Sequence, residues 1–172
     1  NPPSRAVGPR TKVAVDSIEK EVDPVGACIG ARGARIQQVV NELRGEKIDV
    51  IKWSSDPIQY ILNSLSPAKV DLVRLVDPEG QHAHVLVPPD QLSLAIGREG
   101  QNVRLAARLT GWKIDVKNSH EYDQEAEDTA VAELIVQREE EENLQRESEQ
   151  RLEAEQAERA AEDARLRELY PL

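Results

Sequence analysis

Residues 29–33 read IGARG and residues 96–100 read IGREG, while residues 45–50 read GEKIDV and residues 111–116 read GWKIDV. The first two segments lie 67 residues apart and the second two lie 66 apart. Each Gly-x-x-Gly is followed by an apolar-periodic stretch of similar length. Two motifs that repeat in the same order, with a slip of one residue, indicate a duplicated module.

Each copy predicts a short helix, a glycine break, a longer helix and a strand. In the first copy, Asp23 followed by Pro24 is a good helix start, and Gly45 stands where a glycine ends a helix. In the second copy, Asp90 is the predicted N-cap and Gly111 the predicted stop. The predicted ranges are helices 23–29 and 34–44 with strand 47–53, then helices 90–96 and 101–110 with strand 113–117.

Further elements precede the second copy. Residues 56–64 place apolar side chains on one helical face, and residues 70–76 and 83–87 predict two strands joined by a turn at 77–80. The second module is therefore predicted as α-β-β-α-α-β. The first module has only one matching upstream strand, residues 12–16, and the Pro-rich start is not expected to supply the rest. We therefore expect a chain cut from a longer protein.

The acidic character of the chain, a net charge of −10, belongs to its C-terminal third. Residues 1–118 hold 16 Lys and Arg against 14 Asp and Glu, a net charge of +2, whereas residues 119–172 hold 6 against 18, a net charge of −12. Only the first part has the charge of a nucleic-acid binder. The later part has helix-forming composition without a sustained heptad, which predicts a solvated, partly frayed single helix.

Composition excludes several classes of protein. Cys28 is the only cysteine, so no internal disulfide forms, as in a reducing cytoplasm. No apolar run is long enough to cross a bilayer. With two Trp, three Tyr and no Phe, an aromatic base-stacking platform is a poor fit. No nucleophile–base pair or P-loop is present, so we predict no enzyme, no cofactor and no metal.

The repeated Gly-x-x-Gly at a helix start is suited to holding phosphate. Glycine lets the backbone approach an RNA chain closely, and the free N–H groups of the helix that follows favour an anion. The arginines add charge, although Glu99 stands in the second turn. The flanking isoleucines would form the floor for bases, and polar groups of the next helix would read base edges. The candidate RNA-binding residues are Ile29, Gly30, Ala31, Arg32, Gly33, Arg35, Gln37 and Gln38 in the first copy, and Ile96, Gly97, Arg98, Glu99, Gly100, Gln101, Asn102, Arg104 and Arg108 in the second.

The runs DPVGACIGARGARIQQVVNELRGEKIDV and DQLSLAIGREGQNVRLAARLTGWKIDV resemble the tandem KH domains of the NusA family of bacterial transcription elongation, termination and antitermination factors. The resemblance covers about residues 11–118. It implies an α+β fold of two type II KH domains packed together, at 1–53 and 54–118, followed by an acidic helical tail at 119–172. It also implies a cytoplasmic, monomeric protein that holds single-stranded nascent transcript, with RNA polymerase contacted mainly through upstream domains.

Other residues receive plainer interpretations. Cys28 is predicted to be a small core residue. His82 and His84 share one face of a strand, and without a visible third ligand we expect exposed histidines and not a metal pair. Asp49 and Asp115 are expected to pair with Lys or Arg. Trp53 and Trp112 are expected to pack between the modules.

Two other functions fit the sequence less well. The same fold could bind structured or ribosomal RNA, in which case a folded RNA would bind better than a loose strand. Alternatively, the acidic tail could dock a basic protein partner on a scaffold that does not bind RNA. The Glu run at 139–142 could also compete with RNA for the grooves, although a solvated helix face explains it more simply.

Overall fold

The structure is a computed structural model that describes residues 4–5 and 10–171. It divides into two compact units, one running to Glu127 and one starting at Asp128. The first unit therefore includes residues 119–127, which the sequence assigned to the tail. Each unit is described by itself below.

The first module contains a three-stranded sheet in the order β1-β2-β3. Strands β1 (Ser4–Arg5) and β2 (Arg10–Val15) are antiparallel, and β2 is parallel to β3 (Lys47–Lys52). The prediction that the Pro-rich start supplies no strand is wrong, because β1 lies there. Between β2 and β3 come helix α1 (Pro24–Ile29), the 3-10 turn η1 (Ala31–Gly33) and helix α2 (Ala34–Glu42).

The second module repeats this topology and adds a helix in front. Helix α3 (Pro57–Ser64) begins at Asp56, whose side chain accepts a hydrogen bond from the Ile58 N–H. The sheet order is β4-β5-β6, with β4 and β5 antiparallel and β5 and β6 parallel. The elements that complete the predicted α-β-β-α-α-β order are β4 (Leu72–Asp77), β5 (His82–Val87), α4 (Pro89–Ile96), η2 (Arg98–Gly100), α5 (Gln101–Thr110) and β6 (Lys113–Asn118).

The start of α4 differs from the prediction. Its N-cap is Pro88 and Pro89 occupies the first turn, so Asp90 lies inside the helix and not at the cap. Proline fits this place because its fixed φ is already helical and its missing N–H is not needed there. Asp90 still lies where a negative charge is favourable, in the first turn.

The main core lies between the second sheet and its helices. Ala83, Val85 and Val87 of β5 are fully buried there, together with residues such as Ile61 and Ala106. Because side chains alternate along a strand, His82 and His84 lie on the opposite face. That face is also covered, since both histidines are buried. The expectation of exposed histidines is therefore wrong.

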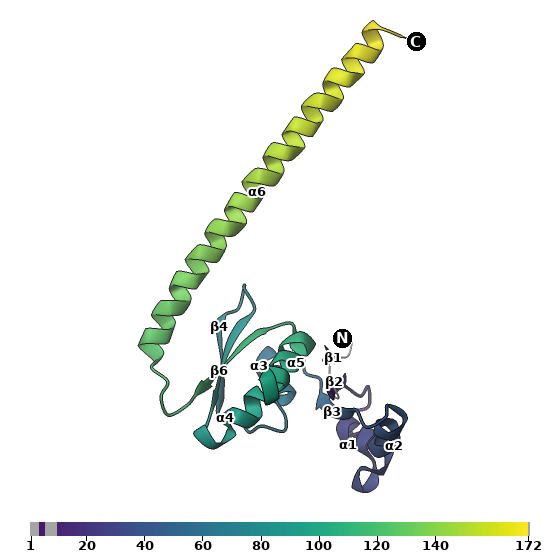
Figure 1. The fold of residues 1–172 in the computed structure, drawn as a ribbon, viewed down its shortest axis with the longest axis vertical. Helices are drawn as coiled ribbons and strands as arrows, with labels where there is room; N and C mark the ends of the chain where they lie inside the picture. Colours follow the sequence, from purple (N-terminus) through teal and green to yellow (C-terminus); the bar gives the residue numbers. More distant parts are fainter. Residues whose placement is uncertain (1–3, 6–9, 172) are drawn as a thin grey trace. The chain divides into compact units, whose positions relative to one another are not determined.

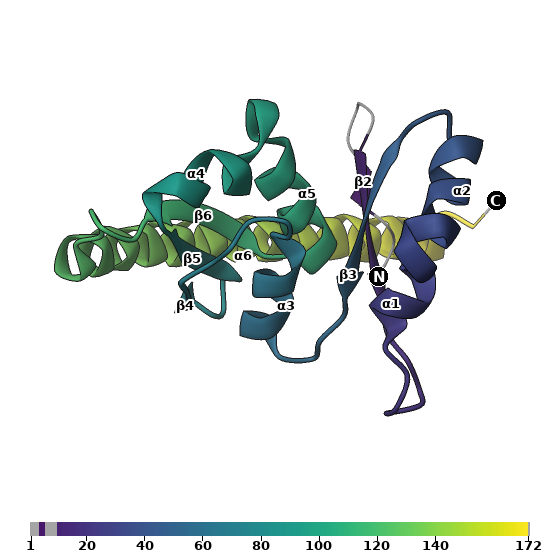
Figure 2. The same cartoon turned by 90° about the horizontal axis from the view of Figure 1, so that it is seen from below.

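The first sheet lies between its own helices, α1 and α2, and helices α3 and α5 of the second module (Figure 2). Ile51, Tyr60 and Leu109 form a small buried cluster there, and the Tyr60 hydroxyl donates to the Leu109 carbonyl at 3.4 Å. Trp53 packs against Tyr60 with ring centroids 6.4 Å apart. Trp112 instead packs on the core of the second module, so its predicted place between modules is wrong. Cys28 is half-buried, not a core residue.

Helix α6 (Gln124–Leu169) is continuous (Figure 1), and most of its residues are exposed. It begins at Asp123, whose carboxylate accepts from the Ala126 N–H at 3.2 Å. Pairs such as Arg138–Glu142 and Arg159–Glu155, four residues apart, stabilise the exposed helix by a few tenths of a kcal/mol each. None of the helices in the described part of the chain is long and apolar enough to span a membrane.

Candidate nucleic-acid interface

The two Gly-x-x-Gly turns have nearly the same backbone conformation. Gly30 has φ 76° and ψ 178°, and Gly97 has φ 78° and ψ 172°. A Cβ on Gly97 would lie 2.7 Å from the backbone nitrogen of Asn102, and a Cβ on Gly30 would lie 2.7 Å from the Arg35 Cβ. Only glycine fits the first position of each turn, because both the conformation and the close approach exclude a side chain.

The last glycine of each turn has a different role. Gly33 and Gly100 are left-handed, with φ 73° and 72°, and they are the N-cap residues of α2 and α5. In neither described helix does a side chain cap the first N–H groups. Space around Gly33 is open, since a Cβ there would meet nothing within 4 Å. Two helix N-termini therefore present backbone N–H groups and a positive dipole end to an incoming anion.

Most of the predicted contact side chains are on the surface, although Arg108 lies in the last turn of α5, at the opposite end of that helix from Gly100. The exposed ones are Ala31, Arg32, Arg35, Gln37, Gln38, Ile96, Arg98, Glu99, Arg104 and Arg108, while Ile29 and Gln101 are half-buried. Two arginines also brace the turns from within the module. Arg104 donates to the Glu99 carbonyl at 2.9 Å, and Arg35 donates to the Ala27 carbonyl.

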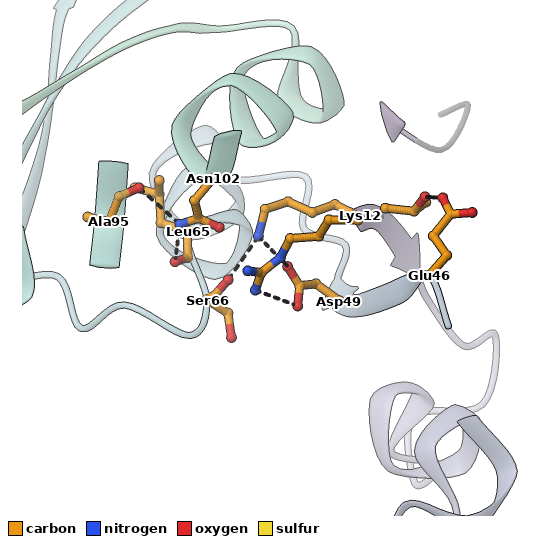
Figure 3. A network of polar contacts seen from close by, with 9 residues as sticks. Lys12, Glu46, Asp49, Leu65, Ser66, Ala95 and Asn102 are labelled. Carbon is orange, nitrogen blue, oxygen red and sulfur yellow. Dashed lines mark hydrogen bonds and ion pairs between the residues drawn. The ribbon is translucent and has the colours of Figure 1, made fainter. Parts of the chain in front are cut away.

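Asn102 is the exception among the predicted readers. It is 2% exposed, and its amide nitrogen donates to the carbonyls of Leu65 and Ala95 at 3.1 and 3.0 Å (Figure 3). Its position does not support reading a base edge. Instead it ties α5 to the end of α4 and to the loop after α3, directly behind the second turn.

A shallow hollow of about 360 Å³ lies beside the second turn. Ile96, Val103, Ile114 and Val116 supply its apolar surface, and Asp115 and Lys117 supply its polar edge. The predicted apolar floor at Ile96 therefore belongs to a real depression between the helices and the edge strand β6. An apolar floor with a polar lip is suited to holding a planar base.

A partly buried ionic network joins β2 of the first module to the loop after α3 of the second (Figure 3). Lys12 of β2 is fully buried, and its ammonium donates to Asp49 at 3.0 Å and to the Ser66 carbonyl at 2.8 Å. Arg10 holds the same carboxylate with two hydrogen bonds, at 2.8 and 3.0 Å. The predicted pairing of Asp49 with a basic residue is confirmed, and it fixes β2 against the second module.

The network also shifts two pKa values. Burial lowers the pKa of Lys12, and the nearby Asp49 opposes that shift only in part. Burial alone would raise the pKa of Asp49, but the hydrogen bonds and charges of Arg10 and Lys12 together lower it. The carboxylate therefore stays ionised and compensates the buried ammonium.

Asp115 repeats Asp49 in sequence but not in environment. Its Oδ2 lies 2.6 Å from Nε2 of His82, so its partner is a histidine and not the predicted Lys or Arg. The sequence interpretation missed this cluster because both histidines were assigned to an exposed face. The parallel register that sets His84 opposite Asp115 was the signal that could have revealed it.

These features define a class of protein: two α-β modules, each with a glycine turn between helices beside an edge strand, which is the arrangement of tandem KH domains. Residues 3–53 match the family described as NusA-like first KH domain, and residues 57–124 match the NusA-like second KH domain. The chain belongs to the family of NusA-like tandem KH domains, which confirms the resemblance and the predicted α+β fold.

Curated relatives agree with this assignment. The chain is 56% identical over 118 residues to the transcription termination/antitermination protein NusA of Halalkalibacterium halodurans, covering 69% of this chain and 31% of the relative. It is 55% identical over 115 residues to the Bacillus subtilis protein of the same name, covering 67% and 31%. For the Thermus thermophilus protein the identity is 50% over 147 residues, covering 82% and 38%. The chain thus spans about a third of the length of these relatives.

Proposed function

We propose that the chain binds single-stranded RNA through both Gly-x-x-Gly turns, and that it is the RNA-reading part of a transcription termination and antitermination factor acting on nascent transcript at RNA polymerase. The observation that carries the proposal is the pair of turns themselves. They share one backbone conformation, they begin two helices whose first N–H groups no described side chain caps, and they belong to one compact unit.

Each part of a turn has a physical role in this proposal. The phosphate lies against the backbone at Gly33, where the space is open, or at Gly100, where the Arg104 guanidinium lies 3.6 Å from the position of a Cβ. At both places helix N–H groups and the dipole favour negative charge. Arg32 and Arg98 add charge-assisted hydrogen bonds at the rim. The base next to the phosphate enters the hollow beside Ile96 in the second module. Phosphate contacts supply affinity, whereas base edges supply sequence preference.

The test replaces the two central residues of one turn with aspartate. Ala31→Asp with Arg32→Asp keeps both glycines, and aspartate tolerates the left-handed φ of 52° at position 32. Like-charge repulsion should weaken binding of a fluorescent single-stranded RNA, measured by anisotropy, by roughly 10-fold or more. Arg98→Asp with Glu99→Asp tests the second turn in the same way.

A matched control makes the same charge change far from the turns in sequence. Arg151→Asp with Ala154→Asp alters two exposed residues of α6 and makes the same change of net charge as the variant of the first turn. It should leave the affinity nearly unchanged. If the turn variants bind RNA as tightly as the parent while circular dichroism shows a native fold, the turns do not hold phosphate. Tighter binding of a folded RNA than of any single strand would instead support the structured-RNA alternative.

A further inference from the structure

The face of the second sheet opposite the core carries a compact group of metal-ligating side chains. Nε2 of His82 lies 2.6 Å from Oδ2 of Asp115, and Nε2 of His84 lies 3.9 Å from the same oxygen. The two imidazole rings are perpendicular, with centroids 5.2 Å apart. One ligand atom from each of the three residues lies within 4.8 Å of the others.

The sequence places these groups on rigid backbone. His82 and His84 are two apart on β5, so both point to one face, and the parallel register sets Asp115 of β6 directly opposite His84. The other face of the strand is packed in the core through Ala83 and Val85. A three-ligand set on adjacent central and edge strands is therefore held without loops, which keeps its geometry fixed.

The outer nitrogen of His84 is also held in place. Its Nδ1 lies 3.0 Å from the Tyr122 hydroxyl, which leaves Nε2 directed toward Asp115. The charged neighbours are Glu127, 4.0 Å from the same Nδ1 and paired with Lys117 at 3.2 Å, and Arg74, which stacks on the Tyr122 ring at 5.6 Å. A ligating histidine whose second nitrogen is fixed by a hydrogen bond is typical of metal sites.

We propose that His82, His84 and Asp115 bind one divalent transition-metal ion of the zinc class, with water completing the coordination. Two imidazoles and a carboxylate are ligands of intermediate softness that suit Zn²⁺. A site with two nitrogen ligands does not favour Mg²⁺ or Ca²⁺, which prefer oxygen ligands. Metal bonds of about 2.0–2.1 Å in a tetrahedron separate the ligand atoms by roughly 3.3 Å, a value between the observed 2.6 and 3.9 Å. Closing the site requires Nε2 of His82 to move away from Asp115 and Nε2 of His84 to move toward it.

Burial and access both suit this ion. His82 and His84 are 6% and 2% exposed, so the two imidazoles form the enclosed side of the site. The Asp115 side chain is 42% exposed and gives the ion a route from solvent. Because Asp115 also lines the hollow beside the second turn, the bound ion would lie next to the RNA groove.

The proposal is tested by titrating Zn²⁺ into the full chain by calorimetry at neutral pH. The parent should bind one equivalent tightly. Asp115→Asn, which removes a partly exposed charge with little change of shape, should weaken that equivalent on the order of 100-fold or more. Tyr122→Phe should weaken it by about 10-fold, as loss of an outer-shell partner does. His120→Asn, at the exposed third histidine, is the matched control and should bind like the parent.

A Co²⁺ titration distinguishes the proposed site from weak metal binding to the carboxylates of α6. Only the histidine site should give the visible spectrum of a tetrahedral Co²⁺ ion. His84→Asn should abolish that spectrum, with the fold checked by circular dichroism. If this variant does not fold, Asp115→Asn decides the question. The proposal is overturned if Asp115→Asn binds one Zn²⁺ ion as tightly as the parent, or if the parent binds no Zn²⁺ ion tightly.

Discussion

At the scale of single residues, charge and backbone strain determine which positions are replaceable. Lys12 is a lysine with a fully buried side chain, and it is tolerated because Asp49 and the Ser66 carbonyl satisfy it. Asp49 in turn is held by three hydrogen bonds from Arg10 and Lys12. The Lys12 ammonium therefore depends on Asp49, whereas Asp49 keeps Arg10 as a second partner.

Asp49→Asn should therefore destabilise the protein by about 3 kcal/mol in urea unfolding, because it leaves the Lys12 ammonium uncompensated. A second change, Lys12→Met, added to Asp49→Asn should recover part of the loss by removing that charge. If the single variant unfolds within about 0.5 kcal/mol of the parent, a change typical of ordinary surface positions, the network has no role in stability.

The pKa of Asp49 adds a pH dependence with a defined sign. Its folded pKa lies below the ordinary 3.8, so its contribution is complete above that pH and is lost as the pH falls through the folded value. The free energy of unfolding of the parent should thus decline more steeply on acidification than that of Asp49→Asn. Equal slopes for the two proteins below pH 4 would contradict the assigned pKa direction.

At the scale of elements, the sequence predicted the repeated order of helices and strands because glycines and strand alternation are local signals. Gly45 and Gly111 both have positive φ, and Gly111 ends α5 as expected. Strand β1 was missed because only two residues form it and its pairing with β2 is tertiary. The burial of His82 and His84 was also missed because it depends on a tertiary contact. Tyr122, which contacts His84, lies outside the predicted module.

The two Gly-x-x-Gly turns were predicted more completely than the residues that hold them in place. The glycines are readable because the backbone demands them, and the exposed arginines follow from the motif. Asn102 could not be assigned, because the sequence does not show which face of α5 meets the Leu65 and Ala95 carbonyls. A polar residue after a Gly-x-x-Gly turn fits two roles equally well, an exposed contact to a base or a buried hydrogen bond that holds the turn.

Asn102→Ala should destabilise the second module by roughly 2 kcal/mol, because two buried carbonyls lose their donor. Gln101→Ala, one position earlier on the same helix and half-buried, is the comparison and should change urea stability by less than about 0.5 kcal/mol. The reverse order, with Gln101→Ala the more damaging, would show that the hydrogen bonds of Asn102 are not what holds the turn.

At the scale of the whole molecule, the packing of the two modules predicts one reader with two grooves. Sheet β1-β2-β3 packs on α3 and α5, and Lys12 bonds across to Ser66, so the modules belong to one compact unit. A KH groove holds about four nucleotides. Once one groove is occupied, binding in the other becomes intramolecular and gains an effective concentration.

An oligonucleotide that spans both grooves should therefore bind about 100-fold or more tightly than either half alone in an anisotropy titration. The variant with Ala31→Asp and Arg32→Asp should reduce the long oligonucleotide to the affinity of a single groove. The long oligonucleotide and its halves must be tested at one salt concentration, because phosphate binding depends on salt. A long oligonucleotide that binds no better than its better half contradicts the two-groove reader.

Helix α6 raises a second question at this scale, namely whether its charge affects RNA. Residues 128–172 carry 14 acidic and 6 basic side chains, a net charge of −8. Tyr122 and Glu127 contact His84 and Lys117, so a truncation that preserves the second module must end after Glu127. A truncation before Glu127 would also remove contacts to the second sheet. An effect on RNA binding could then come from lost packing and not from lost charge.

Removing residues 128–172 should leave RNA affinity unchanged or raise it by a few-fold, because the removed charge repels phosphate. The Debye length of about 8 Å at physiological salt limits that repulsion, so any gain should shrink as salt increases. Anisotropy titrations of both proteins across a salt series measure this directly, with circular dichroism and thermal unfolding confirming that the truncated protein is folded. If the truncated protein is folded but no longer binds RNA, the acidic helix contributes to the site, because removing a charge that only repels RNA cannot lower the affinity.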